Sequence, residues 1–315
     1  TESTLDGWFK KTVELLKPLY EELKWEVFSC DYVQADETTV PVINREKHRA
    51  DKEYLWMVRS VMEKLVIFHY DGGSRAGAVI ESLANQYNFK GYLQCDGFAG
   101  YETAFKTNPD VRLLNCLVHI RRHFEQALDE NREMAQHALT QIQHIYKIER
   151  QCDEAGLSYD ERRQKRQELA RPIMEAMKVW METEGIKYSP GSLTGKAITY
   201  AYTKWDNIIR CLDDGRLYWD NNLAENVQRP ITLSRKNFLF CGNHEAAVNM
   251  SVICSLLATC KAHEVNPRVY LNDVIAQMPY HKKATQEELL NLLPHKWKLK
   301  HPECVLTRQK EESCN

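Results

Sequence analysis

The feature that most constrains the fold of this chain is a change in hydrophobic period after its first segment. Apolar residues recur at helical spacing over residues 5–25, and the chain then turns to short runs rich in Val, Ile, Phe and Tyr. The runs that predict strands are residues 27–36, 54–61, 64–71, 91–96 and 112–118, and the segments that predict helices between them are 74–87 and 99–107. Three strands followed by alternating helices and strands predict an α/β fold with a mixed five-stranded sheet.

Local signals predict where some of these elements begin and end. The polar stretch 44–52 predicts a loop after the first strand, and the short link between the second and third strands predicts an antiparallel hairpin. Ser74 is the expected N-cap of the helix that follows. Pro230 is the expected end of a later helix that begins at Asp220, because proline has no amide hydrogen for the helical ladder.

The second half of the chain is mainly helical. Residues 119–187 contain no strand-like run, and five basic residues fall on one helical face, namely Arg162, Arg163, Lys165, Arg166 and Arg171. A solvated helix face is the favoured explanation, and contact with a DNA backbone is the alternative. The expected division is an N-terminal helix (1–26), a first part of the core (27–119), a helical insertion (120–212), a second part of the core (213–265) and a C-terminal helical tail (266–315).

Composition limits the classes of function. Of the 315 residues, 43% are hydrophobic, which is enough for a sizeable core, and no apolar run approaches the ~20 residues of a membrane span. The net charge of −2 means that any affinity for DNA must come from local basic patches. The 10 cysteines lack the spacing of a disulfide framework and no secretory signal is evident, so we expect a cytoplasmic protein with reduced thiols. Because the sequence starts without Met inside a helical pattern, we expect a further region upstream.

Three acidic residues stand out. Asp36 and Asp96 each end a short apolar run, so both are expected at the tip or in the interior of a strand. Glu225 lies in the sequence Asp-Asn-Asn-Leu-Ala-Glu-Asn (220–226), which is typical of a helix opening. Two strand carboxylates and one helix carboxylate suit a two-metal site for phosphoryl transfer, since Mg²⁺ prefers hard oxygen ligands. In a ribonuclease-H-like core, which this element order matches, the first and fourth strands are neighbours, and a helix on the sheet adds the third acid.

Each acid also has a simpler explanation. An Asp-Gly pair such as the one at 96–97 is a common turn signal, and Asp36 can cap a strand end. Glu225 lies three residues after Asn222, which resembles a capping box. Asp220 is then the competing candidate for the third metal ligand. The three simple explanations are weaker together, because all three acids fall where one topology needs them.

Several short segments carry a family resemblance when they are taken together. They are Gln34–Thr38, Gly91–Gly97 with Gly100 and Tyr101, Cys116–Phe124, Ile145–Glu149, Gly215–Leu217, Asp220–Glu225, Ser234–Phe240 and Asn266–Leu271. Over about residues 27–280 the chain resembles the catalytic part of transposases of the insertion-sequence 66 family, a bacterial group with an Asp-Asp-Glu site. The resemblance implies a ribonuclease-H-like fold and catalytic acids at Asp36, Asp96 and Glu225. Ser234 and Val118 depart from the usual Gly and Ala of the family, and neither contacts the acids in this reading.

The resemblance also implies a mechanism and partners. Two divalent metal ions, Mg²⁺ or alternatively Mn²⁺, would support in-line displacement at phosphorus. Cys116 and His119 are expected to support the acids without binding the metal, and a zinc site shared with Cys260 and His263 is the less favoured alternative. Trp219 is expected in the core, with base stacking as the alternative. The expected contacts to DNA phosphates are Arg121, Arg122, Arg235 and Lys236, with surface charges near helix ends as the alternative explanation.

The leading interpretation is the catalytic region of a DNA transposase. It would cleave transposon ends and transfer them to target DNA, as a homo-oligomer that associates with the nucleoid when it acts. One alternative is a catalytically silent DNA-binding relic or accessory protein that keeps the fold, and metal-dependent DNA cleavage separates it from the leading interpretation. The other alternative is a related nuclease that hydrolyses DNA without joining it, which a strand-transfer assay detects.

Overall fold

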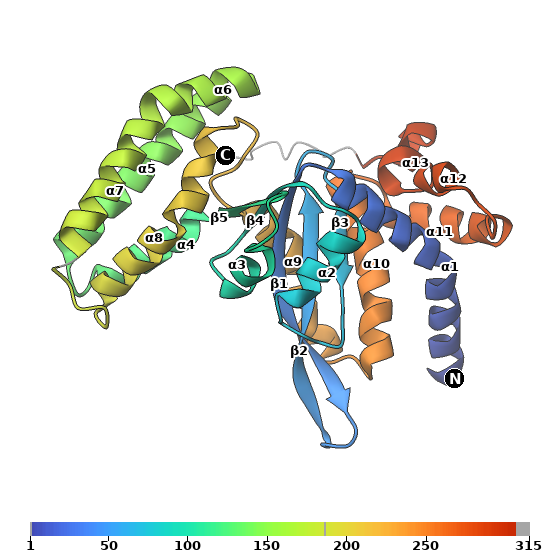
Figure 1. Cartoon of the computed structure of the whole chain (residues 1–315). Helices are drawn as coiled ribbons and strands as arrows, with labels where there is room; N and C mark the ends of the chain where they lie inside the picture. The colour runs from blue at the N-terminus through green and yellow to red at the C-terminus, as the bar shows by residue number, and fades with distance from the viewer. Residues whose placement is uncertain (1, 186, 307–315) are drawn as a thin grey trace, which may run out of the picture. The chain divides into compact units, whose positions relative to one another are not determined.

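A five-stranded mixed sheet is the centre of the fold, as predicted. The computed structural model of the chain describes residues 2–185 and 187–306 (Figure 1). Its strands are β1 (Tyr32–Asn44), β2 (Arg49–Ser60), β3 (Val66–His69), β4 (Gly91–Cys95) and β5 (Val111–Asn115). Their order in the sheet is β3-β2-β1-β4-β5, and β1 pairs with β2, and β2 with β3, antiparallel. The α/β class with a mixed sheet is therefore confirmed, and the ribonuclease-H-like fold stays a prediction.

The first two strands are longer than predicted. β1 and β2 form one antiparallel hairpin, paired from Val33 with Ser60 to Asn44 with Arg49, and only residues 45–48 form its turn. The predicted loop at 44–52 is thus wrong in length, because buried β-branched residues continue along β1 at a period of two. At the other end, residues 27–29 belong to α1 (Glu2–Ser29), since Val27 continues its helical apolar stripe.

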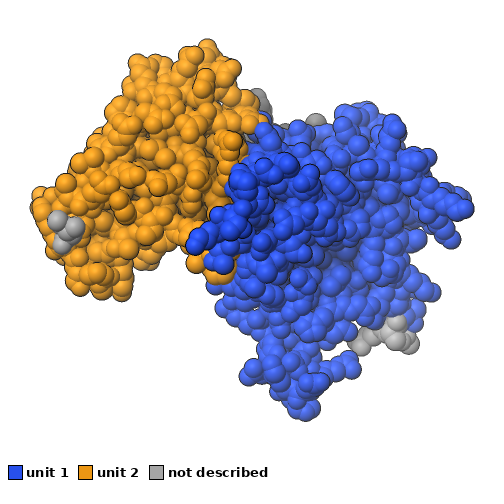
Figure 2. All heavy atoms as spheres, in the orientation of Figure 1, with its two compact units in different colours: residues 1–91, 103–111, 223–315 blue, residues 92–102, 112–222 orange. Residues whose placement is uncertain are grey.

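The chain divides into two compact units, shown in Figure 2. Unit 1 comprises residues 1–91, 103–111 and 223–315, and unit 2 comprises residues 92–102 and 112–222. The α-helices that lie within unit 2 are α4 (Leu117–Ala127), α5 (Arg132–Glu154), α6 (Tyr159–Lys165), α7 (Arg171–Gly185) and α8 (Leu193–Ile209). The helices of unit 1 other than α1 are α2 (Ala78–Gln86), α9 (Asn222–Phe238), α10 (His244–Ala262), α11 (Pro267–Gln277), α12 (Gln286–Leu290) and α13 (Pro294–Lys300), and α3 (Ala99–Phe105) crosses the boundary. Within residues 2–185 and 187–306, no helix has the length and apolar character needed to span a bilayer.

Helices α9 and α10 cover one face of β1–β3. The core between them includes Val40, Leu55, Met57, Phe68, Ala224, Ile231 and Ala247. Helix α10 also satisfies the outer edge of β3, where the amides of Val66 and Phe68 donate to the hydroxyl oxygens of Thr259 (3.1 Å) and Ser255 (2.8 Å). An open strand edge offers unpaired amides to other chains. The two hydroxyl groups occupy these amides and so close the edge of β3 to further strand pairing.

Two predicted helix boundaries are wrong. Helix α2 begins at Ala78, with Gly77 as its N-cap residue, and Ser74 instead accepts the amide hydrogen of Ala76 in the preceding turn. Helix α9 continues through Pro230 to Phe238. Proline at this position removes one ladder bond, whose acceptor would be the carbonyl of the exposed Asn226, and water can satisfy that carbonyl.

Two of the five residues of the basic face predicted for residues 162–171 make internal contacts of unit 2, whereas Arg163 and Lys165 are exposed, as the favoured explanation expects. Arg166 is only 1% exposed, and Glu149 accepts from its Nε (2.7 Å) and its Nη2 (2.8 Å). Its remaining donors reach three carbonyl oxygens at 2.8–2.9 Å, those of Cys211, Asp214 and Leu217. All five N–H donors of this guanidinium are thus used. Arg162 pairs with the same Glu149 at 3.0 Å, so for these two arginines both the solvent and the DNA interpretation are wrong.

Candidate active site

Asp36 lies on β1, in unit 1, and is partly exposed. It pairs with Met57 across the hairpin, and its Oδ1 accepts the amide hydrogen of Glu37 at 2.9 Å. This bond fixes the carboxylate relative to the strand. Gln34, two residues earlier, projects from the same face of β1, because side chains alternate along a strand.

Glu225 lies in the first turn of α9, and the start of that helix is attached to β1 and β2. The side-chain oxygen of Gln34 accepts the amide hydrogen of Ala224 at 3.1 Å. Gln34 is fully buried, and its cross-strand partner Arg59 donates from Nη1 to the carbonyl of Leu223 at 3.3 Å. The residue directly before Glu225 is therefore held on the face of β1 from which Asp36 projects. Both predicted acids belong to unit 1, and the approach of their carboxylates to each other stays a prediction.

Asp96 directly follows β4, in unit 2, and is partly exposed. Its Oδ1 accepts the amide hydrogen of Phe98 at 2.8 Å, which parallels the local bond of Asp36. Its carbonyl oxygen accepts from Nδ2 of the buried Asn115 at 2.8 Å, and Asn115 in turn accepts from Asn207 of α8 at 2.9 Å. The convergence of this carboxylate with the two of unit 1 stays a prediction. The residues that the structure describes include no group of three or more His, Cys, Asp or Glu arranged to hold a metal ion.

Asp220, the competing third ligand, is engaged inside unit 2. Its Oδ2 accepts the hydroxyl hydrogen of Tyr146 at 3.1 Å, and its Oδ1 accepts the amide hydrogen of Asn222 at 3.1 Å. Both carboxylate oxygens are thus already hydrogen-bonded, one to α5 and the other within the turn that precedes α9. The adjacent Trp219 is 2% exposed, with the guanidinium of Arg166 at 5.6 Å from the ring centre, so it belongs to the core as expected.

Cys116 does not lie in a strand, which corrects the prediction. It is the N-cap residue of α4, is 1% exposed, and burial raises the pKa of its thiol to about 12. His119 lies in the first turn of α4, where its Nε2 is 3.3 Å from Nη1 of Arg122. Of the other half of the zinc alternative, Cys260 is buried, and Nε2 of His263 is 3.0 Å from the carbonyl of Glu63.

The predicted DNA contacts are described only in part. Arg121 and Arg122 are exposed on α4, and Arg121 pairs with Glu125 at 2.8 Å. Such an exposed pair contributes little stability, so Arg121 can exchange its partner for a phosphate. Arg235 and Lys236 belong to α9, but their side chains lie outside the described part of the structure.

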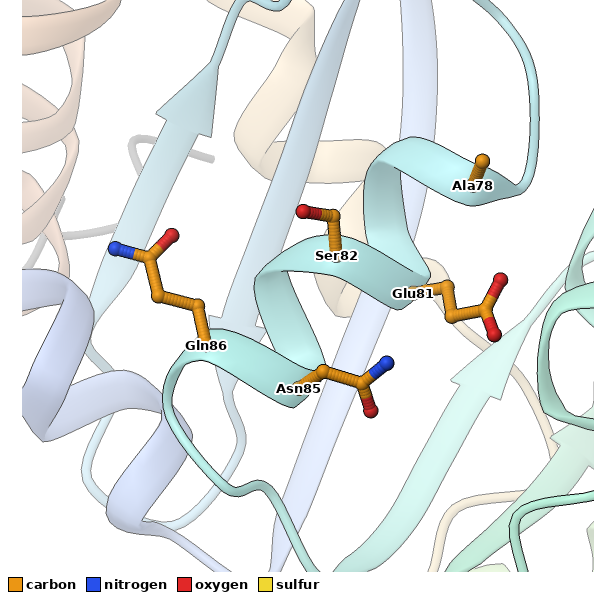
Figure 3. A pocket seen from close by; sticks show the side chains of 5 residues that line it. All are labelled: Ala78, Glu81, Ser82, Asn85 and Gln86. Atoms are coloured by element: carbon orange, nitrogen blue, oxygen red, sulfur yellow. The ribbon is translucent and has the colours of Figure 1, made fainter.

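One open depression of about 700 Å³ lies on the surface of α2 (Figure 3). Its lining consists of Ala78, Glu81, Ser82, Asn85 and Gln86. These residues follow one exposed side of a single helix, and none of them is a predicted site residue. The depression therefore adds nothing to the candidate active site.

The residues that hold the backbone next to the acids were not among those predicted from the sequence. Gln34 lies two positions before Asp36, and a period of two puts both on one strand face, so the pattern could have indicated it. Arg59 and Asn115 carry no such signal, since their contacts with Leu223 and with the carbonyl of Asp96 depend on tertiary structure.

Comparison with known proteins identifies close similarity to one family. Residues 1–249 match the family model described as "Transposase IS66 family", and residues 255–295 match the one described as "IS66 C-terminal element". Among curated proteins, the chain is similar to the uncharacterized proteins y4hP (27% identity over 318 residues) and y4jD (28% over 309 residues) of Sinorhizobium fredii. The alignments cover 94% of this chain and 56% and 59% of these relatives, so the chain spans little more than half of their length. The family matches confirm the resemblance predicted from the sequence.

Proposed function

We propose that this chain, which belongs to the IS66 transposase family, is the metal-dependent catalytic region of a DNA transposase. The observation that carries the proposal is the 3.1 Å bond between Gln34 on β1 and the amide of Ala224, next to Glu225. This bond attaches the first turn of α9, which carries Glu225, to the strand that carries Asp36, although Gln34 and Ala224 are 190 residues apart in the sequence. The strand order, in which β1 and β4 are consecutive, supports Asp96 as the third member and supports a ribonuclease-H-like core.

The side chains suit hard divalent cations. Asp36, Asp96 and Glu225 are partly exposed carboxylates, which is the donor type that Mg²⁺ and Mn²⁺ prefer. The two aspartates each have Oδ1 held by a nearby backbone amide, at 2.9 and 2.8 Å. Their carboxylates are therefore oriented before any ion binds, which lowers the cost of assembling a site.

The role of the protein in the reaction would be to hold the metal ions and to orient the carboxylates that bind them. Asp36, Asp96 and Glu225 would bind two divalent ions, and the chain supplies no nucleophile of its own. When bound, the ions would activate water or a DNA 3′-hydroxyl and stabilise the leaving oxygen. Gln34 and Arg59 would keep the first turn of α9 at a fixed distance from β1. DNA is the expected partner, with Arg121 and Arg122 as exposed phosphate contacts and a homo-oligomer as the expected active form.

The test measures nicking of a supercoiled plasmid by the purified chain with Mg²⁺ or Mn²⁺. We expect Asp36→Asn, Asp96→Asn and Glu225→Gln each to lower the rate by ~100-fold or more, because each removes a charged metal ligand whose effect is several kcal/mol. Asp220→Asn should lower it much less. Hydroxyl radicals generated by bound Fe²⁺ should also cut the polypeptide near residues 36, 96 and 225.

Two outcomes would overturn the assignment. Nicking that needs no divalent ion contradicts the metal-dependent mechanism and favours a catalytically silent protein with a contaminating nuclease. A larger loss in Asp220→Asn than in Glu225→Gln exchanges their roles. If cleavage is normal but a plasmid target never receives the cut strand, the chain is a nuclease without joining activity.

A further inference from the structure

One face of α8 is directed at the segment that carries Asp96. Tyr200, Lys204 and Asn207 lie at positions i, i+4 and i+7 of this helix and so share one side of it. Lys204 is buried and pairs with Glu102 of α3, and Asn207 reaches the carbonyl of Asp96 through Asn115. All of these residues belong to unit 2. Helix α8 therefore contacts α3 directly and is connected to the Asp96 turn through Asn115.

Tyr200 lies against Gly97, the residue that directly follows Asp96. A Cβ atom added to Gly97 would lie 2.0 Å from the hydroxyl oxygen of Tyr200 and 2.6 Å from its Cζ. Glycine at position 97 is thus required for space, and the backbone next to Asp96 lies directly against the phenol. The Asp-Gly pair is not only a turn signal, since the absence of a side chain at 97 is what admits Tyr200.

The ring of Tyr200 is itself held in place. His123 of α4 lies against it, with ring centres 4.2 Å apart. Burial, with a smaller contribution from the nearby Asp96, raises the pKa of the Tyr200 hydroxyl above its usual value. Packed between His123 and Gly97, the Tyr200 phenol restricts the space that is open to the Asp96 turn.

We propose that Tyr200 is a positioning residue for Asp96, through which α8 fixes the metal-binding geometry of the Asp96–Phe98 turn. The proposal rests on the proposed function of Asp96 as a metal ligand. It makes the helical insertion part of the active site, since the insertion supplies the surface against which the turn is held. A group that locks a metal ligand in one orientation commonly affects metal affinity by ~10–100-fold.

The experiment uses the full chain and two readouts that do not depend on DNA cleavage. One is the affinity for Mn²⁺, from the electron paramagnetic resonance signal of the free ion. The other is hydrogen exchange of the Phe98 amide, whose hydrogen is donated to Asp96 Oδ1. We expect Tyr200→Ala to weaken Mn²⁺ binding ~10-fold or more and to speed exchange at Phe98, with plasmid nicking partly restored by high Mn²⁺.

A second variant tests the contact itself. Gly97→Ala should weaken Mn²⁺ binding because its new Cβ meets Tyr200, and the double variant Gly97→Ala/Tyr200→Ala should bind better than Gly97→Ala alone. The matched control is Tyr202→Ala on the same helix, whose exposed hydroxyl bonds to Glu182, and it should leave both readouts unchanged. This arm remains informative if Tyr200→Ala alone fails to fold.

The outcomes separate this inference from the function on which it rests. Normal Mn²⁺ affinity and normal Phe98 exchange in Tyr200→Ala, together with loss of Mn²⁺ binding in Asp96→Asn, would refute the role of Tyr200 and leave the proposed function standing. Unchanged Mn²⁺ binding in Asp96→Asn would refute the proposed function first. Strictly additive effects in Gly97→Ala and Tyr200→Ala would show that the two residues do not act through their contact.

Discussion

Gln34 is fully buried, and its oxygen accepts the amide hydrogen of Ala224. Replacing it by methionine keeps the volume and removes the acceptor. A buried amide without a partner costs ~1–3 kcal/mol, so we expect Gln34→Met to lower the free energy of unfolding by about that amount. Because Glu225 directly follows Ala224, whose amide would lose its acceptor, we also expect slower metal-dependent plasmid nicking. Urea denaturation and the nicking assay measure the two effects.

Gln86 offers a matched control for this substitution. It is exposed on α2, so Gln86→Met should change the stability by less than about 0.5 kcal/mol and leave nicking unaltered. If Gln34→Met loses stability but nicks at the normal rate, Gln34 supports the fold without orienting Glu225. The position of that carboxylate must then be set by other contacts of α9.

Arg166 joins three elements of unit 2 through its guanidinium group. It connects the π-helical turn Arg166–Ala170 to Glu149 of α5 and to the loop after α8. Arg166→Met would leave the largely buried Glu149 and several carbonyls without this partner, and breaking such a pair costs ~3–5 kcal/mol. We therefore expect a loss of this size in the free energy of unfolding, measured by urea denaturation.

Arg163, in the adjoining helix α6, is the matched control for the Arg166 substitution. It is exposed, and Arg163→Met should change the free energy of unfolding by less than about 0.5 kcal/mol. Equal effects of the two substitutions would mean that the buried pair of Arg166 contributes no more than a surface charge. The salt dependence of DNA binding should also be measured with Arg163→Met, since it alters charge without altering the core.

The strands were predictable where the hydrophobic pattern is the same along the whole strand. β4 and β5 lie within one to three residues of their predicted ranges, because each is a short apolar run between polar turns. The β1–β2 hairpin was underestimated, because its distal half is partly exposed and rich in charge. Charge patterning could not reveal that Arg166 is internal, since its partner Glu149 and its acceptor carbonyls come from separate elements.

The candidate site shows the same limit. Asp36, Asp96 and Glu225 were found from strand ends, a helix opening and family motifs, and all three lie on or next to the expected elements. The side chains that hold their backbones were not found, because hydrogen bonds such as Gln34 to Ala224 span many elements of the chain. Convergence of the acids is a property of both units together and stays a prediction.

At the scale of the whole molecule, stability should depend on pH through three histidines of unit 1. The pKa values of His69, His263 and His295 are lowered from 6.5 to about 4, mainly because burial disfavours the charged imidazolium. Between these values the unfolded chain binds more protons than the folded one. The free energy of unfolding therefore falls as the pH drops from 6.5 toward 4, with about 1–2 kcal/mol from the partly exposed His69.

This dependence is measured by urea denaturation at several pH values. His69→Gln should flatten the loss between pH 6.5 and 5, a window in which most carboxylates are still ionised. His144→Gln, at an exposed position of α5, is the control and should leave the slope as it is. A slope that is the same in all three proteins would show that His69 titrates alike in the folded and unfolded chain.

The hydroxyl groups that close the edge of β3 have a consequence for how this chain is made. Ser255 lies 187 residues after Phe68, and Thr259 lies 193 residues after Val66. A ribosome that adds ~5–20 residues per second needs roughly 10–40 s to reach them. Throughout that interval the edge of β3 can pair with a strand of another nascent chain on the same messenger. Slow codons between β3 and α10 would lengthen this exposure, so the rate of translation itself influences how much of the protein escapes aggregation.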